Sequence, residues 1–134
     1  MTTPVLGTKG AEMDLMIRQG ATLGPIYVWM EDADNSPMDI TGAVVRAHIR
    51  RRADRSLVPG AEAVIELTDA PNGAFTWEFA AADTANLDAD PSSADAELSR
   101  YYWDMEIEFS DGRVVPLCHG AVRVYREITR EGQS

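Results

Sequence analysis

Three carboxylates stand at alternate positions of one segment: Asp104, Glu106 and Glu108. Side chains alternate between the two faces of a strand, so this spacing places all three carboxylates on one face. A pair of carboxylates on one face is a candidate for the hydrolysis of sugars. That chemistry needs one acid kept protonated by an apolar pocket.

Basic side chains at the same spacing favour a structural role for these acids: Arg46, His48 and Arg50. If the two segments are neighbouring strands, the bases and the acids face each other across the strand pair. The acids then stay ionised, and each opposite-charge pair contributes roughly 0.2–1 kcal/mol. The pattern therefore predicts a row of ion pairs that helps to set the register of the strands.

This chain contains few residues that could carry out nucleophilic catalysis. The only histidines are His48 and His119, and the only cysteine is Cys118. Cys118 and His119 are adjacent, so in a strand they point to opposite faces and cannot act as nucleophile and base. No cluster of cysteine, histidine and acidic residues offers the four ligands of a zinc site. We expect no catalytic residue, no metal and no cofactor.

Two acidic stretches begin like calcium loops: Asp32, Asp34 and Ser36 in the first, and Asp88 and Asp90 in the second. In the first stretch the sixth position, where a calcium loop needs Gly, is Pro37, and the twelfth position, where it needs Glu, is Ala43. In the second stretch the closing position is Ser99. Both stretches are therefore interpreted as ordinary solvated turns.

Large aromatic side chains could form a binding platform: Tyr27, Trp29 and Tyr102. Such a platform would suit a carbohydrate ring or a protein partner. Large aromatic residues in β-sandwiches more often fill the core or the gaps between strands. The two interpretations differ in whether these side chains are exposed together.

The strongest local signal is a β-hairpin in the last third of the chain. Arg100 to Phe109 alternates strictly between apolar and polar residues, the turn is Ser110-Asp111-Gly112, and the second arm runs from Arg113 to Arg126. Strict alternation indicates one buried face and one wet face, and an Asp-Gly turn is typical of hairpins. The predicted inward side chains of the first arm are Tyr101, Trp103, Met105, Ile107 and Phe109.

Further strands are expected over Met13–Arg18, Ile26–Met30, Ala43–Arg50, Ala61–Leu67 and Ala74–Phe79. Ile26–Met30 is apolar on both sides, which predicts a central or covered strand. Ala80–Leu87 predicts a short helix in which Leu87 fills a gap between two layers, and the polar segments Arg51–Gly60 and Asp88–Ser99 predict surface loops. This pattern predicts an all-β fold, an antiparallel β-sandwich with one short helical connector, with a small barrel as the alternative.

Length and charge limit the organisation of the chain and its partners. The 134 residues fit one domain, expected over residues 13–129 between a flexible N-terminal arm (1–12) and a C-terminal tail (130–134). A net charge of -10 opposes binding to nucleic acid. One cysteine allows no internal disulfide, and the absence of an apolar run or a signal peptide favours synthesis in the cytoplasm without membrane insertion.

An ordered set of segments resembles small immunoglobulin-like proteins of tailed-bacteriophage tails and baseplates, similar to the N-terminal domain of the baseplate upper protein. The segments are Asp39-Ile40-Thr41-Gly42, Ala43–Arg52, Asn72-Gly73-Ala74-Phe75, Tyr102-Trp103-Asp104-Met105-Glu106, Asp111-Gly112 and Gly120-Ala121-Val122-Arg123-Val124. The likeness extends over about Met13 to Thr129.

The resemblance implies an immunoglobulin-like sandwich that serves as a non-enzymatic structural protein of the virion, made in the bacterial host cytoplasm. Its partners would be other virion proteins, in many symmetric copies, without nucleic acid or membrane. The candidate partner-binding residues are Pro4, Val5, Leu6, Arg50, Arg51, Arg52, Arg55 and Tyr102. The alternatives are a host-surface or carbohydrate-binding module, which needs exposed aromatic residues, and a small hydrolase, which needs a concave site.

Overall fold

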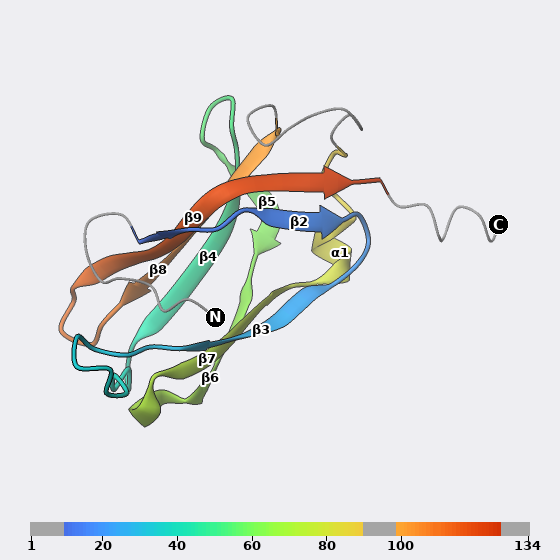
Figure 1. Cartoon of the computed structure of the whole chain (residues 1–134). Coiled ribbons are helices and arrows are strands. Elements are labelled where there is room, and N and C mark those ends of the chain that lie inside the picture. Colours follow the sequence, from blue (N-terminus) through green and yellow to red (C-terminus); the bar gives the residue numbers. More distant parts are fainter. Residues whose placement is uncertain (1–9, 90–98, 127–134) are drawn as a thin grey trace.

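Two β-sheets packed face to face form the body of the protein in a computed structural model that describes residues 10–89 and 99–126 (Figure 1). The elements are β1 (Ala11–Glu12), β2 (Leu15–Arg18), β3 (Leu23–Trp29), β4 (Val44–Arg51), β5 (Leu57–Glu62), β6 (Val64–Asp69), the 3₁₀ turn η1 (Ala70–Asn72), β7 (Ala74–Phe79), α1 (Ala81–Thr84), β8 (Tyr101–Glu108) and β9 (Val114–Tyr125). The larger sheet has the order β1-β9-β8-β4-β5, with β2 also paired to β9, and the smaller sheet has the order β3-β7-β6.

The strand order is that of an immunoglobulin-like sandwich, in which a three-stranded sheet packs on a larger one. Strands β1 and β2 run parallel to β9, and the other neighbouring strands are antiparallel. The predicted all-β sandwich with one short helical connector is confirmed. At the corner between α1 and β8, the Tyr101 hydroxyl accepts a hydrogen bond from the Asp88 backbone N–H at 2.9 Å. Immunoglobulin-like folds use a tyrosine in a related way at this corner.

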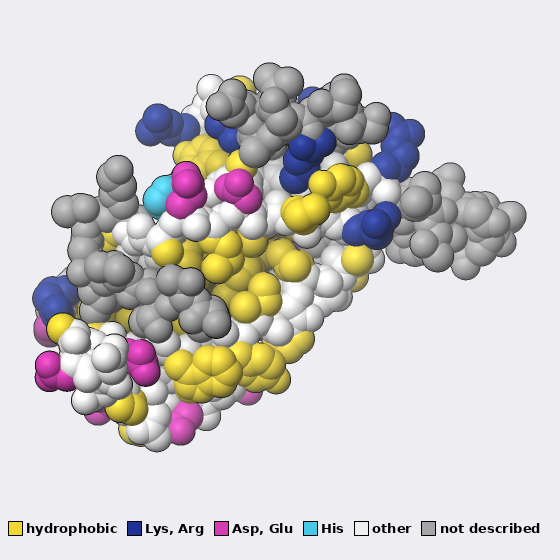
Figure 2. All heavy atoms as spheres, in the orientation of Figure 1, with side chains coloured by type: hydrophobic (Ala, Val, Ile, Leu, Met, Phe, Trp, Pro, Cys, Tyr) yellow, Lys and Arg dark blue, Asp and Glu magenta, His cyan; other side chains and the backbone are white. Residues whose placement is uncertain are grey.

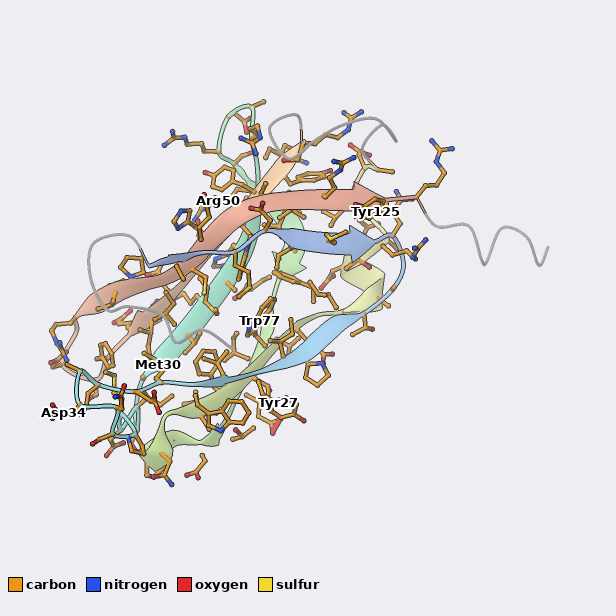
Figure 3. The ribbon with its side chains drawn as sticks, in the orientation of Figure 1. Tyr27, Met30, Asp34, Arg50, Trp77 and Tyr125 are labelled. Carbon is orange, nitrogen blue, oxygen red and sulfur yellow. The ribbon has the colours of Figure 1, made fainter. Side chains whose placement is uncertain are left out.

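Aromatic side chains from both sheets meet in the core. Trp77 of β7 and Trp103 of β8 are fully buried and stack with ring centroids 5.0 Å apart, and Figure 3 shows Trp77 between the two sheets. Burying an aromatic side chain of this size removes about 150–250 Å² from water, so this pair is a major contact between the layers. Leu87, which follows the helical connector, is also buried in this core, as the sequence predicts.

The terminal hairpin and its pairing with β4 follow the sequence prediction. β8 alternates buried and half-buried residues along its whole length. Both neighbours of β8 pair with it along its whole length. In β9, Val114 is opposite Glu108, and in β4, Val44 is opposite the same residue. The register shifts once between β8 and β9, at Leu117, which places an extra buried residue in β9.

Strand β3 lies at the edge of the smaller sheet, because its only partner in that sheet is β7. The sequence predicts a central strand or a covered edge; among the described residues β3 is an edge strand whose outer face is uncovered, so this prediction is wrong. Its alternation is correct, since Val28 is buried while Tyr27 and Trp29 are each 55% exposed. An apolar run does not tell a strand with two buried faces from an edge strand with an exposed aromatic face.

The beginning of the domain also differs from the expectation. The arm was predicted to end at Glu12, but Ala11 and Glu12 pair with Cys118 and His119 of β9. The expected strand over Met13–Arg18 is shortened to β2. Several predicted features lie outside the described residues: Pro4, Val5, Leu6, Asp90, most of the loop Asp88–Ser99 and the tail 130–134.

The break between β1 and β2 lies where the chain makes a close contact with Gly120 of β9. The backbone of Met13 crosses β9 at this glycine, where a Cβ atom would lie 2.6 Å from the Met13 carbonyl carbon. The carbonyl oxygen of Met13 accepts a hydrogen bond from the Trp103 indole N–H at 2.6 Å, and the Asp14 carboxylate accepts one from the Ala121 backbone N–H at 2.9 Å. These two hydrogen bonds hold Met13 and Asp14, at the start of the domain, against β8 and β9.

Candidate functional site

The outer face of the larger sheet carries the predicted ion pairs. Arg46 contacts the carboxylates of Glu106 and Glu108, and Arg50 Nε lies 2.9 Å from Asp104 Oδ2. These side chains are about one-third exposed. Exposed pairs of this kind contribute roughly 0.2–1 kcal/mol each, so the row specifies strand register more than it adds stability. All three candidate acids therefore have an arginine partner.

Both histidines lie in one lateral row across this sheet. The row runs Glu12, His119, Asp104, His48 and Glu62, each residue directly opposite the next in the neighbouring strand. His48 Nε2 is 3.7 Å from Glu62 Oε1. Within residues 10–89 and 99–126, no group of three or more histidine, cysteine or acidic side chains is placed to hold a metal ion.

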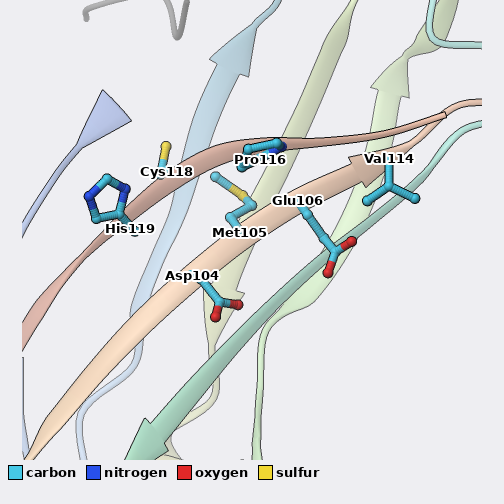
Figure 4. Close-up of a pocket in the computed structure, with 7 residues that line it drawn as sticks. All are labelled: Asp104, Met105, Glu106, Val114, Pro116, Cys118 and His119. Carbon is cyan, nitrogen blue, oxygen red and sulfur yellow. The ribbon is translucent and has the colours of Figure 1, made fainter. Parts of the chain in front are cut away.

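A shallow hollow of about 390 Å³ lies beside this row, over β8 and the first half of β9. Figure 4 shows its lining, with Asp104 and Glu106 from β8 and His119 and Pro116 from β9. Cys118 also lines it but is only 3% exposed, and burial raises the pKa of its thiol to about 11. Cys118 is opposite Met105 and His119 is opposite Asp104, so the two point to opposite faces as predicted. A thiol with a raised pKa is a poor nucleophile at neutral pH.

The loop predicted over Arg51–Gly60 is shorter in the structure, because β4 extends to Arg51 and β5 begins at Leu57. We call residues Arg50–Arg55, the end of β4 and the turn that follows it, the arginine loop. Arg50 is held by Asp104 and by the carbonyl of Arg55, and Arg52 donates to the carbonyl and hydroxyl oxygens of Ser99 at 2.9 and 3.0 Å. Arg51 and Arg55 are exposed. Arg52 is exposed as well, and Arg51 Nη1 donates a hydrogen bond to the Ser56 hydroxyl at 3.4 Å. The loop thus presents exposed arginines, of which Arg55 makes no side-chain hydrogen bond to any described residue.

The turn of the arginine loop is held by Asp54. The Asp54 carboxylate accepts hydrogen bonds from the hydroxyl and the backbone N–H of Ser56, which lower the pKa of Asp54. Arg55 itself adopts a φ of 63°, a left-handed conformation that is uncommon outside glycine. The exposed arginines are therefore presented by a defined turn.

Tyr102 lies on the outer face of the larger sheet, near the arginine loop. It lines a hollow of about 340 Å³ together with Arg52, Glu12 and Asp14. Of the predicted partner-binding residues, the structure thus brings Tyr102 together with Arg52 in this hollow and with Arg50, which is directly opposite Tyr102 in β4. A third hollow, of about 380 Å³, lies at the end of the sandwich, and its lining includes Arg51, Arg100 and Tyr101.

The aromatic face is the outer surface of the smaller sheet around Tyr27 and Trp29. Their rings are nearly parallel, 19° apart, with centroids separated by 6.1 Å. Figure 2 shows apolar atoms gathered along the lower margin of the molecule, where β3 runs in Figure 1. Tyr102 belongs to the other sheet, so the three predicted aromatic residues do not form one platform.

Carboxylates border the aromatic face. Across the sheet, Tyr27 is opposite Thr76, which in turn is opposite Glu66, and the next row places Val64 opposite Glu78. The segments 23–29, 64–69 and 74–79 contain no lysine, arginine or histidine. That absence, readable from the sequence, is the signal that could have identified an anionic aromatic surface.

No protein-family model matches the chain, and no curated protein matches it either. In the described part of the chain, no helix is long and apolar enough to cross a membrane. The surfaces that can bind a partner are therefore identified from their geometry: the ion-paired face, the arginine loop and the aromatic face.

Proposed function

We propose that this chain is a non-enzymatic structural protein of a tailed-bacteriophage virion, which acts by protein–protein contacts in the tail, the baseplate or the head-to-tail region. The observation that carries the proposal is the aromatic face. Tyr27 and Trp29 are more than half exposed and lie on an edge strand of the sandwich. Exposed aromatic clusters mark interaction surfaces, because Tyr and Trp bury a large area with little loss of conformational entropy.

The resemblance of the sequence to phage tail proteins supports the same function. In a virion, the chain contacts other virion proteins in many symmetric copies. One candidate contact area lies at the end of the larger sheet and consists of Arg50, Arg51, Arg52, Arg55 and Tyr102. The residues Pro4, Val5 and Leu6 remain candidate contacts of the N-terminal arm.

Carbohydrate binding is the second candidate function, and the Tyr27–Trp29 pair favours it specifically. Two nearly parallel exposed rings suit stacking against sugar rings, and the Glu66 carboxylate on the same face could accept hydrogen bonds from hydroxyl groups. A host-surface glycan would then be the ligand. Binding of purified protein to a glycan array, abolished by Trp29→Ala, would identify this function.

The proposed function is tested on particles of the phage whose genome encodes the chain. Quantitative mass spectrometry of purified particles should find the chain in many copies per particle, and deletion of the gene should stop assembly at a defined stage. Absence of the chain from purified particles would refute the proposal.

A truncation separates the arm from the domain. Because Ala11 and Glu12 pair with β9, the deletion should remove residues 1–9 and retain both. The truncated protein should fold with unchanged stability and enter particles less efficiently. If the truncated protein enters particles as efficiently as the full chain, Pro4, Val5 and Leu6 are not part of the contact surface.

A further inference from the structure

We propose that the aromatic face of one copy of this chain binds the arginine loop of a second copy. This inference rests on the proposed function, since it names a contact by which repeated copies could assemble. Each copy carries both surfaces, so the contact is heterologous and generates a ring or a filament.

The aromatic face has the chemistry of a site for arginine. The faces of Trp and Tyr rings attract cations, and guanidinium groups stack on such rings. Glu66, in the row of Tyr27, and Glu78, in the next row described, supply negative charge on the same sheet. The three strands of this sheet contribute no cation that would compete.

The arginine loop has the complementary chemistry. Arg51 and Arg55 are exposed, whereas Arg46 and Arg50 are engaged by carboxylates of β8. Asp54 is held within the loop by Ser56, which fixes the turn that presents the two exposed guanidinium groups. The loop therefore offers cations in a chain whose overall charge is -10.

The two surfaces of one molecule are too far apart to bind each other. The loop joins β4 and β5 of the larger sheet, and the aromatic face is the outer side of the smaller sheet. Figure 1 shows the loop at the upper margin of the molecule and the smaller sheet of β3, β7 and β6 along its lower side. Contact between them requires two copies.

The net charge does not prevent this contact at physiological ionic strength. The Debye length there is about 8 Å, so the general repulsion between two acidic molecules is largely screened. Arginine against a ring or a carboxylate acts at van der Waals distance, well inside that length. Local complementarity therefore decides the interaction.

Two variants test the proposal, because each removes one surface and retains the other. The loop variant combines Arg51→Glu with Arg55→Asn, since Asn tolerates the left-handed conformation at position 55. The face variant combines Tyr27→Ala with Trp29→Ala. Sedimentation velocity at about 0.15 M salt measures association, and circular dichroism establishes that both variants fold.

Wild-type protein should self-associate in a concentration-dependent manner, and each variant alone should be monomeric. An equimolar mixture of the two variants should form a 1:1 dimer that grows no further, because only one intact face and one intact loop remain. Trp29→Ala alone should weaken the association by about tenfold or more, as expected for a central aromatic contact.

Matched control variants are Arg113→Glu, an exposed arginine at the opposite end of the sandwich, and Met16→Ala, an exposed apolar residue of the larger sheet. Both controls should associate like the wild type. Wild-type protein that stays monomeric up to about 1 mM, or variants that fail to combine, would overturn the inference. Glycan binding through Trp29 without self-association would overturn it as well. None of these results bears on whether the chain is present in the virion, so the failure of this inference can be told apart from the failure of the proposed function.

Discussion

Replacing Gly120 with alanine should detach the start of the domain from the core. The new Cβ would lie 2.6 Å from the Met13 carbonyl carbon and 2.9 Å from Asp14 Oδ1, and it would overlap the Met13 carbonyl oxygen. Ordinary contacts begin at 3.4 Å, so the backbone at Met13 has to move by about 0.8 Å or more. Gly120 does not have a positive φ, so the cost comes from this contact and not from the conformation of the residue.

The magnitude follows from the hydrogen bonds that this movement breaks. The Met13 carbonyl is the acceptor for the buried indole N–H of Trp103, and leaving a buried donor unsatisfied costs about 1–3 kcal/mol. The bonds from Met13 N–H to the His119 carbonyl and from Ala121 N–H to Asp14 contribute about 0.5–1.5 kcal/mol each. We expect the free energy of unfolding to fall by about 2–6 kcal/mol, a large share of the stability of an ordinary domain.

Urea denaturation followed by tryptophan fluorescence measures this loss. Gly112→Ala is the control, because a Cβ at Gly112 meets no atom within 4 Å and carries only the cost of its φ of 93°. That cost is about 1–2 kcal/mol. If Gly120→Ala lowers the free energy of unfolding by less than about 0.5 kcal/mol, or by less than Gly112→Ala does, the proposed close packing of Met13 across β9 is refuted.

Three further predictions concern the corner, the thiol and the response to acid. Tyr101→Phe removes the acceptor of the Asp88 N–H and should lower the free energy of unfolding by about 1–2 kcal/mol in urea titrations; an unchanged midpoint would contradict the corner contact. Cys118 should resist thiol reagents at pH 8 in the native protein and react at once in concentrated urea, because burial raises its pKa to about 11; rapid native labelling would contradict its burial. The hydroxyl and N–H of Thr41 lower the pKa of Asp39 below its ordinary value of 3.8, so Asp39 stabilises the fold above that pH and loses this effect as the pH falls through its lowered pKa. Urea midpoints measured from pH 5 downward should therefore decline less steeply in Asp39→Asn, and identical profiles would contradict the prediction.

The terminal hairpin of β8 and β9 and the neighbouring strand β4 could be predicted, because short stretches of sequence specify them. Period-2 alternation from Tyr101 onward fixes which face is buried, and Asp111-Gly112 fixes the turn. The matching charge patterns then predict that β4 pairs with β8. The structure places Arg46 directly opposite Glu106 and His48 directly opposite Asp104. The closest ionic contacts are diagonal, as between Arg50 and Asp104, which strand register alone does not specify.

The exposure of the aromatic face could not be predicted from the run that contains it. Tyr27 and Trp29 alternate with buried residues, and both central and edge strands satisfy that pattern. Their exposure depends on how many strands the smaller sheet contains and on what covers its outer side. Both are properties of the whole chain.

The start of the domain depends on a contact between residues far apart in the sequence. Nothing near Met13 signals a break between β1 and β2, because the close contact at the break is with Gly120 of β9. The pairing of Ala11 and Glu12 with β9 is likewise long-range. The arm predicted from the sequence is therefore longer than the arm in the structure, because Ala11 and Glu12 belong to the sheet.

Cryo-electron microscopy of purified phage particles is the most direct test of the central claim that this chain is a repeated structural component of the virion. We predict density for the immunoglobulin-like sandwich in many symmetric copies, with the aromatic face of each copy covered by protein. Particles that contain no such density, although the host expresses the chain, would contradict the account.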